Sequence, residues 1–243
     1  MFEAGLWGLA GSSALVIGAL AGLTWKIPRR WVALLMAFGS GALVSALAFD
    51  LTEEAFAVGG TAAVAVGLAA GALAFFGGNQ LLHRRGAARR GKRTRHATEG
   101  TGTAIVLGAV LDGIPESVVL GSTLLAGAGV GFPFLAAVIV SNVPEAFSAA
   151  VDLQRQGHRP RWIIGLWVIV ALVSGLSAAL GYGLFGAMGA SDLVPFAQAF
   201  AAGAILTMLA DTMIPVAFDD GGDLTGLATV FGFALAFLLS KVS

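Results

Sequence analysis

Long apolar runs dominate the chain, and short polar or basic segments separate them. A run of about 20 apolar residues is long enough for a helix to cross the hydrocarbon core of a bilayer. The pattern predicts one all-α transmembrane domain over residues 1–243, with no room for a soluble domain. Its eight spans are Leu6–Leu23, Trp31–Leu51, Val58–Phe76, Thr103–Leu125, Phe132–Val151, Trp162–Phe185, Val194–Val216 and Leu224–Leu239.

Composition and charge agree with a multi-pass membrane protein and give it an orientation. Hydrophobic residues make up 57% of the chain and charged residues 12%, whereas soluble domains are about half apolar and a quarter charged. Of the 14 Lys and Arg, all except Lys241 fall in alternate connecting segments. The positive-inside rule therefore predicts both termini outside the cytoplasm. With Glu3 before the first span and cations after it, that span is expected to be retained and not cleaved as a signal peptide.

The longest polar segment, 82–102, is rich in Arg, Gly and Thr. This composition predicts a flexible cytoplasmic loop. Its cations would fix the topology and contact anionic lipid headgroups. His83 and His96 leave open a second role, as a metal-sensing loop.

Two predicted spans carry a proline-glutamate pair, in Asp112-Gly-Ile-Pro-Glu116 and in Ser141-Asn-Val-Pro-Glu145. A carboxylate inside a membrane is costly, and proline removes a helix hydrogen bond, so both motifs indicate function. Residues four apart share one helix face. The short connection 126–131 makes the two spans antiparallel neighbours, so that their polar faces can meet. The expected metal ligands are Asp112, Glu116, Ser141, Asn142 and Glu145.

Three clustered carboxylates cannot all stay ionised in a membrane unless a cation lies among them. A bound divalent cation satisfies that requirement, and oxygen donors suit Mg, Mn or Fe(II) better than a softer ion. Zinc sites more often include imidazole or thiolate, but no histidine lies near the motifs and the chain has no cysteine. Two other readings remain open, in which the acids are protonated structural residues or form a proton relay.

An internal similarity links two distant spans, because Ala37–Phe56 aligns without gaps on Ala199–Phe218. The predicted topology places these segments in opposite orientations. Similar sequences in opposite orientation are typical of the inverted repeats of secondary transporters, whose substrate site lies near the bilayer midplane. The expected repeat comprises spans 1–3 and 6–8, around spans 4 and 5.

Further acids near the span ends are candidates for the ion pathway. Asp50, Glu53 and Glu54 lie at the outer end of span 2, where they could gather cations at an entrance. Asp152 and Asp211 lie toward the inner ends of spans 5 and 7, where either could line an exit. A solvated helix end is the ordinary alternative for Asp50, Glu53 and Glu54.

The chain resembles the ZIP family (Zrt-, Irt-like proteins), transporters that carry zinc and other divalent metals into the cytoplasm. The resemblance rests on eight spans, outer termini, a long loop between spans 3 and 4, and Pro-Glu motifs in spans 4 and 5. It implies a non-enzymatic plasma-membrane (inner-membrane) transporter, often a homodimer, with no cofactor beyond its transported metal and no nucleic-acid partner. It also implies that spans 1, 4, 5 and 6 move against a scaffold of spans 2, 3, 7 and 8.

This sequence departs from the usual His-Asn-x-Pro-Glu-Gly motif of that family. Asp112 replaces the histidine and Gly113 carries no donor, while Ser174 is the nearest candidate ligand in span 6. These differences favour one metal site over two and put zinc specificity in question. The resemblance still implies zinc as the default substrate, with Mn, Fe(II) or Cd as the alternatives.

Three other functions compete with metal transport. The chain could be a proton-driven carrier or channel for a non-metal substrate, or a transport-deficient homologue that retains only metal binding. An intramembrane aspartyl protease using Asp112 and Asp211 would require a Gly-x-Gly-Asp motif, which is absent.

Overall fold

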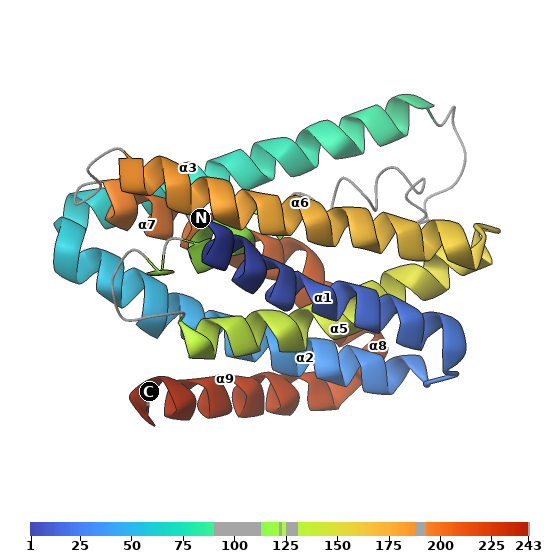
Figure 1. Cartoon of the computed structure of the whole chain (residues 1–243). Helices are drawn as coiled ribbons and strands as arrows, with labels where there is room; N and C mark the ends of the chain where they lie inside the picture. The colour runs from blue at the N-terminus through green and yellow to red at the C-terminus, as the bar shows by residue number, and fades with distance from the viewer. Residues whose placement is uncertain (90–112, 122, 125–130, 188–192, 243) are drawn as a thin grey trace.

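The computed structural model describes residues 1–89, 113–121, 123–124, 131–187 and 193–242, and all regular secondary structure in these ranges is helical. Figure 1 shows the helices running roughly along one direction. They are α1 (Phe2–Thr24), α2 (Arg29–Ala46), η1 (Leu47–Thr52), α3 (Glu53–Arg89), α5 (Phe132–Arg155), α6 (Pro160–Ala187), α7 (Leu193–Met208), η3 (Leu209–Met213), α8 (Ile214–Gly221), η4 (Gly222–Leu224) and α9 (Thr225–Val242). A further helical stretch covers 113–121.

Five helical runs of the described chain are long and apolar enough to cross a membrane, as expected of a helical membrane protein. Two of them, Arg29–Leu81 with 53 residues and Val194–Val242 with 49, are far longer than the roughly 20 residues that one crossing needs. Each contains a glycine with positive φ, Gly60 at 68° and Gly222 at 66°, a conformation that other residues rarely adopt. At the left of Figure 1 the chain reverses between α2 and α3, so this run forms two antiparallel helices.

The helices pack in two groups. Helix α1 packs against α5 and α6, and these three helices form the α1 group. Helix α2 packs against α9, and α3 packs against α7; these four helices form the α2 group. Among the described helices, the main contact between the groups is the packing of α2 against α5.

Glycines allow the helices of the α2 group to touch backbone to backbone. A Cβ atom at Gly41 of α2 would lie 1.9 Å from the Thr229 carbonyl oxygen of α9, and one at Gly203 of α7 would lie 2.2 Å from the Leu68 carbonyl oxygen of α3. No side chain fits at those distances. Small residues are the usual means of close helix packing in membranes, where the apolar lipid provides little force to drive helices together.

The two halves of the α2 group share a series of features at one constant spacing of 162 residues. In each half, the carbonyl of a phenylalanine contacts a glycine of the neighbouring helix, and a second, buried glycine lies in the same helix interface. Each half also has a π-helical segment and, farther along, a turn glycine with positive φ. The pairs are Phe38 with Phe200, Gly41 with Gly203, Leu47 with Leu209, and Gly60 with Gly222.

The described residues of the predicted spans all lie in helices, which confirms their helical character; the division into eight spans stays a prediction. For the fourth span, 103–125, the described residues are 113–121 and 123–124. Helix α3 runs to Arg89, past the predicted start of the polar loop at residue 82. The rest of that loop, with His96, lies outside the described residues, and the side chain of His83 is not described.

Substitution of Gly41 by alanine is expected to destabilise the protein, because the new methyl group would collide with the Thr229 carbonyl. Overpacking of this kind costs about 1–3 kcal/mol, which lowers the melting temperature by several degrees. The matched control is Gly165→Ala in α6, where an added Cβ meets nothing within 4 Å. Thermal unfolding in detergent compares the two variants; equal melting temperatures would contradict the close packing of α2 and α9.

Candidate metal site

Both Pro-Glu pairs lie inside helices. The stretch 113–121 carries Glu116, which is buried, with 4% of its surface exposed. Helix α5 continues through Pro144, and its Glu145 is partly buried near the middle of the helix. Asp112, the first residue of the span 4 motif, lies outside the described residues.

Glu116 and Glu145 are close enough for their negative charges to interact. No described Lys or Arg forms an ion pair with either of them, since the described ion pairs involve Asp152 alone. Like charges in an apolar interior repel strongly and need a proton or a cation between them. The two glutamates therefore form a site whose charge has to be neutralised by a proton or by a cation.

Ser141 lies where α5 comes closest to α2. A Cβ atom at Gly39 of α2 would lie 2.8 Å from the Cα atom of Ser141, so only glycine fits there. The hydroxyl of Ser141 is buried and donates to the Val138 carbonyl at 3.0 Å, which leaves its lone pairs available. Glu145 follows four residues later and therefore shares the α5 face that contains Ser141.

Asn142 points toward α1. Its Nδ2 atom donates to the Gly11 carbonyl of α1 at 3.4 Å, and the residue is buried. This bond helps to fix α5 on α1 and leaves the amide oxygen as the possible ligand atom.

Ser174 of α6 lies beside the first described residue of the span 4 motif. Its Oγ atom is 2.9 Å from the position that a Cβ atom would take at Gly113, and the residue is buried. The structure thus brings α6 to the site, as the choice of Ser174 from the sequence requires.

Two buried hydroxyls near the site are absent from the sequence prediction. Ser117 directly follows Glu116, and Ser12 of α1 donates to the Gly8 carbonyl and, at 3.4 Å, to the Ala171 carbonyl of α6. Serines are common in transmembrane helices as packing residues. The sequence alone gives no signal that separates these two from the others.

The assignment of the predicted residues as metal ligands stays a prediction. Among the described residues, no group of three or more His, Cys, Asp or Glu gathers in one place. The third predicted carboxylate belongs to Asp112, outside that part of the chain.

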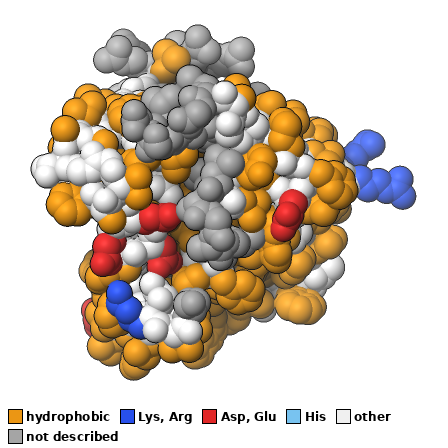
Figure 2. Space-filling model, turned by 60° about the vertical axis from the view of Figure 1, so that its left-hand side comes forward, with side chains coloured by type: hydrophobic (Ala, Val, Ile, Leu, Met, Phe, Trp, Pro, Cys, Tyr) orange, Lys and Arg blue, Asp and Glu red, His pale blue; other side chains and the backbone are white. Residues whose placement is uncertain are grey.

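Two of the three acids near the end of the second predicted span form hydrogen bonds with neighbouring side chains. Asp50 accepts a hydrogen bond from Ser240 of α9, and Glu54 accepts one from Gln198 of α7 at 3.1 Å. The Nζ atom of Lys241 lies 5.5 Å from the ring centre of Phe49. Glu53, the third acid of this group, is exposed. On the face seen in Figure 2, acidic side chains gather beside a basic one. Their predicted role at an entrance is untested.

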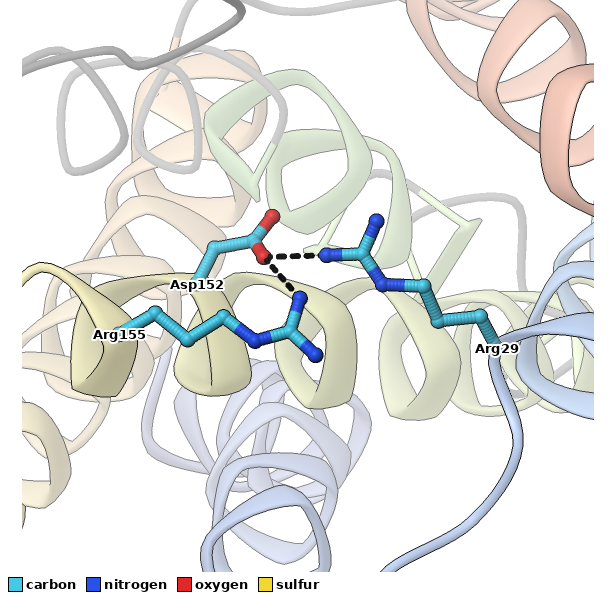
Figure 3. Close-up of polar contacts among 3 residues, drawn as sticks. All are labelled: Arg29, Asp152 and Arg155. Atoms are coloured by element: carbon cyan, nitrogen blue, oxygen red, sulfur yellow. Dashed lines mark hydrogen bonds and ion pairs between the residues drawn. The ribbon is translucent and has the colours of Figure 1, made fainter.

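The two acids predicted to line an exit differ in their surroundings. Asp152, in the last turn of α5, lies between Arg29 and Arg155 (Figure 3). Asp211 lies in η3 and is exposed. Asp152 also lines a cavity of about 540 Å³, which Asp211 does not.

One comparison with known proteins gives a relative. The chain is 26% identical over 219 residues to an Arabidopsis thaliana protein named "Putative zinc transporter". The match covers 88% of this chain and 34% of that protein, so the chain spans about a third of the relative's length. No protein-family model matches the chain.

Replacement of Glu116 or Glu145 by glutamine is expected to stabilise the metal-free protein. Glutamine keeps the shape of the side chain and removes the repulsion between two buried carboxylates. The gain is expected to be about 1–3 kcal/mol, seen as a melting temperature higher by several degrees in detergent with EDTA. The control is Asp223→Asn at the exposed turn before α9, which should change little. Lower melting temperatures for both glutamine variants would show that the carboxylates already have stabilising partners.

Proposed function

We propose that this chain is a ZIP-type transporter that carries divalent metal cations into the cytoplasm through a site at Glu116 and Glu145. The observation that carries the proposal is the pair of interacting carboxylates, Glu116 buried and Glu145 partly buried, on two helices of an apolar bundle. A passing divalent cation would balance the charge of the two carboxylates. Ionisable residues inside a membrane are costly, so their presence there favours a functional site.

In this proposal Asp112 and Ser141 complete the metal ligands, with Asn142 and Ser174 at the edge of the site. The oxygen donors permit Mn, Fe(II) or Cd as well as zinc. Zinc remains the default substrate, because of the ZIP resemblance and the name of the Arabidopsis relative.

The proposed architecture has eight spans and an inverted repeat. The two long helical runs each supply two spans, split at Gly60 and Gly222, and α1, α5, α6 and the span that contains 113–121 supply the rest. The constant spacing of 162 residues supports the repeat, because interface glycines and π-helical segments recur at equivalent places. Such repeats allow one central site to open alternately to each side of the membrane.

The proposed location is the plasma membrane, with both termini outside the cytoplasm. The cations on α2, α5 and α6 support this orientation, since Arg29, Arg155 and Arg161 lie at helix ends that the topology places inside. A homodimer is compatible with the family resemblance.

Uptake by proteoliposomes tests the function. Zn, Mn, Fe(II) and Cd are offered separately to the full chain, and at least one is expected to enter. Glu116→Ala and Glu145→Ala should each reduce uptake to the level of empty liposomes, because either change removes a charged ligand. Asp223→Asn, which removes an exposed carboxylate elsewhere, should leave uptake unchanged.

The outcomes separate the competing functions. Uptake that survives both alanine substitutions would show that the site is wrong. Metal binding without uptake would indicate a transport-deficient homologue, and restored zinc uptake in Asp112→His would support that reading. Proton movement without any metal dependence would favour a proton-driven carrier.

A further inference from the structure

The cavity of about 540 Å³ begins close to the proposed metal site and extends to one end of the bundle. On α5 its lining starts at Phe147 and Ser148, within one helical turn of Glu145. On α2 it runs from Arg29 to Met36, one turn before Gly39, which contacts Ser141. By the proposed topology this end faces the cytoplasm, so the cavity lies between the site and that side of the membrane.

An ion-pair cluster stands at the far end of this cavity. The Nη2 atom of Arg29 lies 3.0 Å from Oδ1 of Asp152, and Nη1 of Arg155 lies 3.5 Å from the same oxygen. Figure 3 shows both guanidinium groups pointing at the one carboxylate. All three residues line the cavity. Arg29 begins α2 and Asp152 lies in the last turn of α5, so the first pair joins two helices.

The Arg29–Asp152 pair crosses the contact between the α1 group and the α2 group. Helix α5 belongs to the first and α2 to the second, and elsewhere on this contact Gly39 allows a close backbone approach. Within the described ranges, no other ion pair joins two helices. The pair is therefore the charged link between the groups at the inner end.

This link is weak enough to break repeatedly. The side chains of Arg29 and Asp152 are 55% and 45% exposed, and water screens an ion pair of that kind. Such pairs change a two-state equilibrium by up to about fivefold. Interactions of this size bias a conformation without locking it.

We infer that Asp152 is a positioning residue for the conformation that contains the inner cavity. Its bridge to Arg29 holds α5 against α2 in that conformation, and the bridge breaks when the site opens to the other side. This inference rests on the proposed transport function, because a central site must be exposed alternately to the two sides. It assigns Asp152 to the contact between α5 and α2 and not to the metal ligands of an exit pathway.

Cross-linking tests whether the bridge must break. The chain has no cysteine, so Arg29→Cys with Asp152→Cys introduces the only two thiols. Bis-methanethiosulfonate reagents of increasing spacer length then join α2 to α5 in proteoliposomes. Metal uptake is expected to fall at least tenfold at full cross-linking, verified by mass spectrometry, and to return when a reductant releases the link.

The matched control is Asp152→Cys with Arg155→Cys, which places both thiols on α5. Cross-linking this pair leaves α2 free and should leave uptake unchanged. Full uptake by the cross-linked Arg29/Asp152 pair would overturn the inference. Loss of uptake by both double-cysteine variants before cross-linking would also overturn the inference, because Asp152 would then act directly on the ion. If the unsubstituted chain takes up no metal, the proposed function fails instead.

Single substitutions provide an independent test of the same link. Arg29→Gln and Asp152→Asn both remove the bridge, so they should change the uptake rate in the same direction, by up to about fivefold. Arg155→Gln removes the same charge from the same cavity but leaves the Arg29–Asp152 bridge between α2 and α5 in place. Its effect on the uptake rate should therefore be smaller. Opposite effects of Arg29→Gln and Asp152→Asn would overturn the inference, since the charge at the cavity mouth would then control the rate.

Discussion

The main physical constraint on this molecule is a pair of carboxylates in an apolar interior without a described counter-charge. Glu116 and Glu145 interact with each other, and no described basic residue forms an ion pair with either. In a membrane such a pair is costly unless something compensates for it. The surrounding features are consistent with that need: oxygen donors at Ser141 and Asn142, and a cavity that begins within one turn of Glu145.

Close packing fixes the helices that carry and surround these carboxylates. Within the α2 group, glycines such as Gly41 and Gly203 bring backbones into contact and make a tightly packed unit. Between the groups, Gly39 meets Ser141 at the site, whereas the charged link of Arg29 and Asp152 is half exposed. Close backbone contacts therefore occur within the α2 group and, at Gly39, between the two groups, whereas the charged link at one end is a weak polar contact.

Much of the fold follows from the sequence, because long apolar runs flanked by cations allow few arrangements. The helix positions agree wherever the structure describes them, and the motif residues Glu116 and Glu145 lie near each other. The pairing of Asp152 with Arg29 could not be predicted, since Arg29 lies 123 residues away and no local pattern links the two. The position of Ser12 and Ser117 near the site could not be predicted either, because in a sequence a serine in an apolar span is the same as an ordinary packing residue.

The central claim is that a divalent cation binds between Glu116 and Glu145. Anomalous diffraction from crystals of the full chain grown with Zn or Mn tests it directly, because the signal identifies the element and its position. The account predicts one strong anomalous peak within coordination distance of both glutamates, lost in the Glu116→Gln variant. A peak elsewhere, or none at a metal concentration that supports uptake, would contradict it.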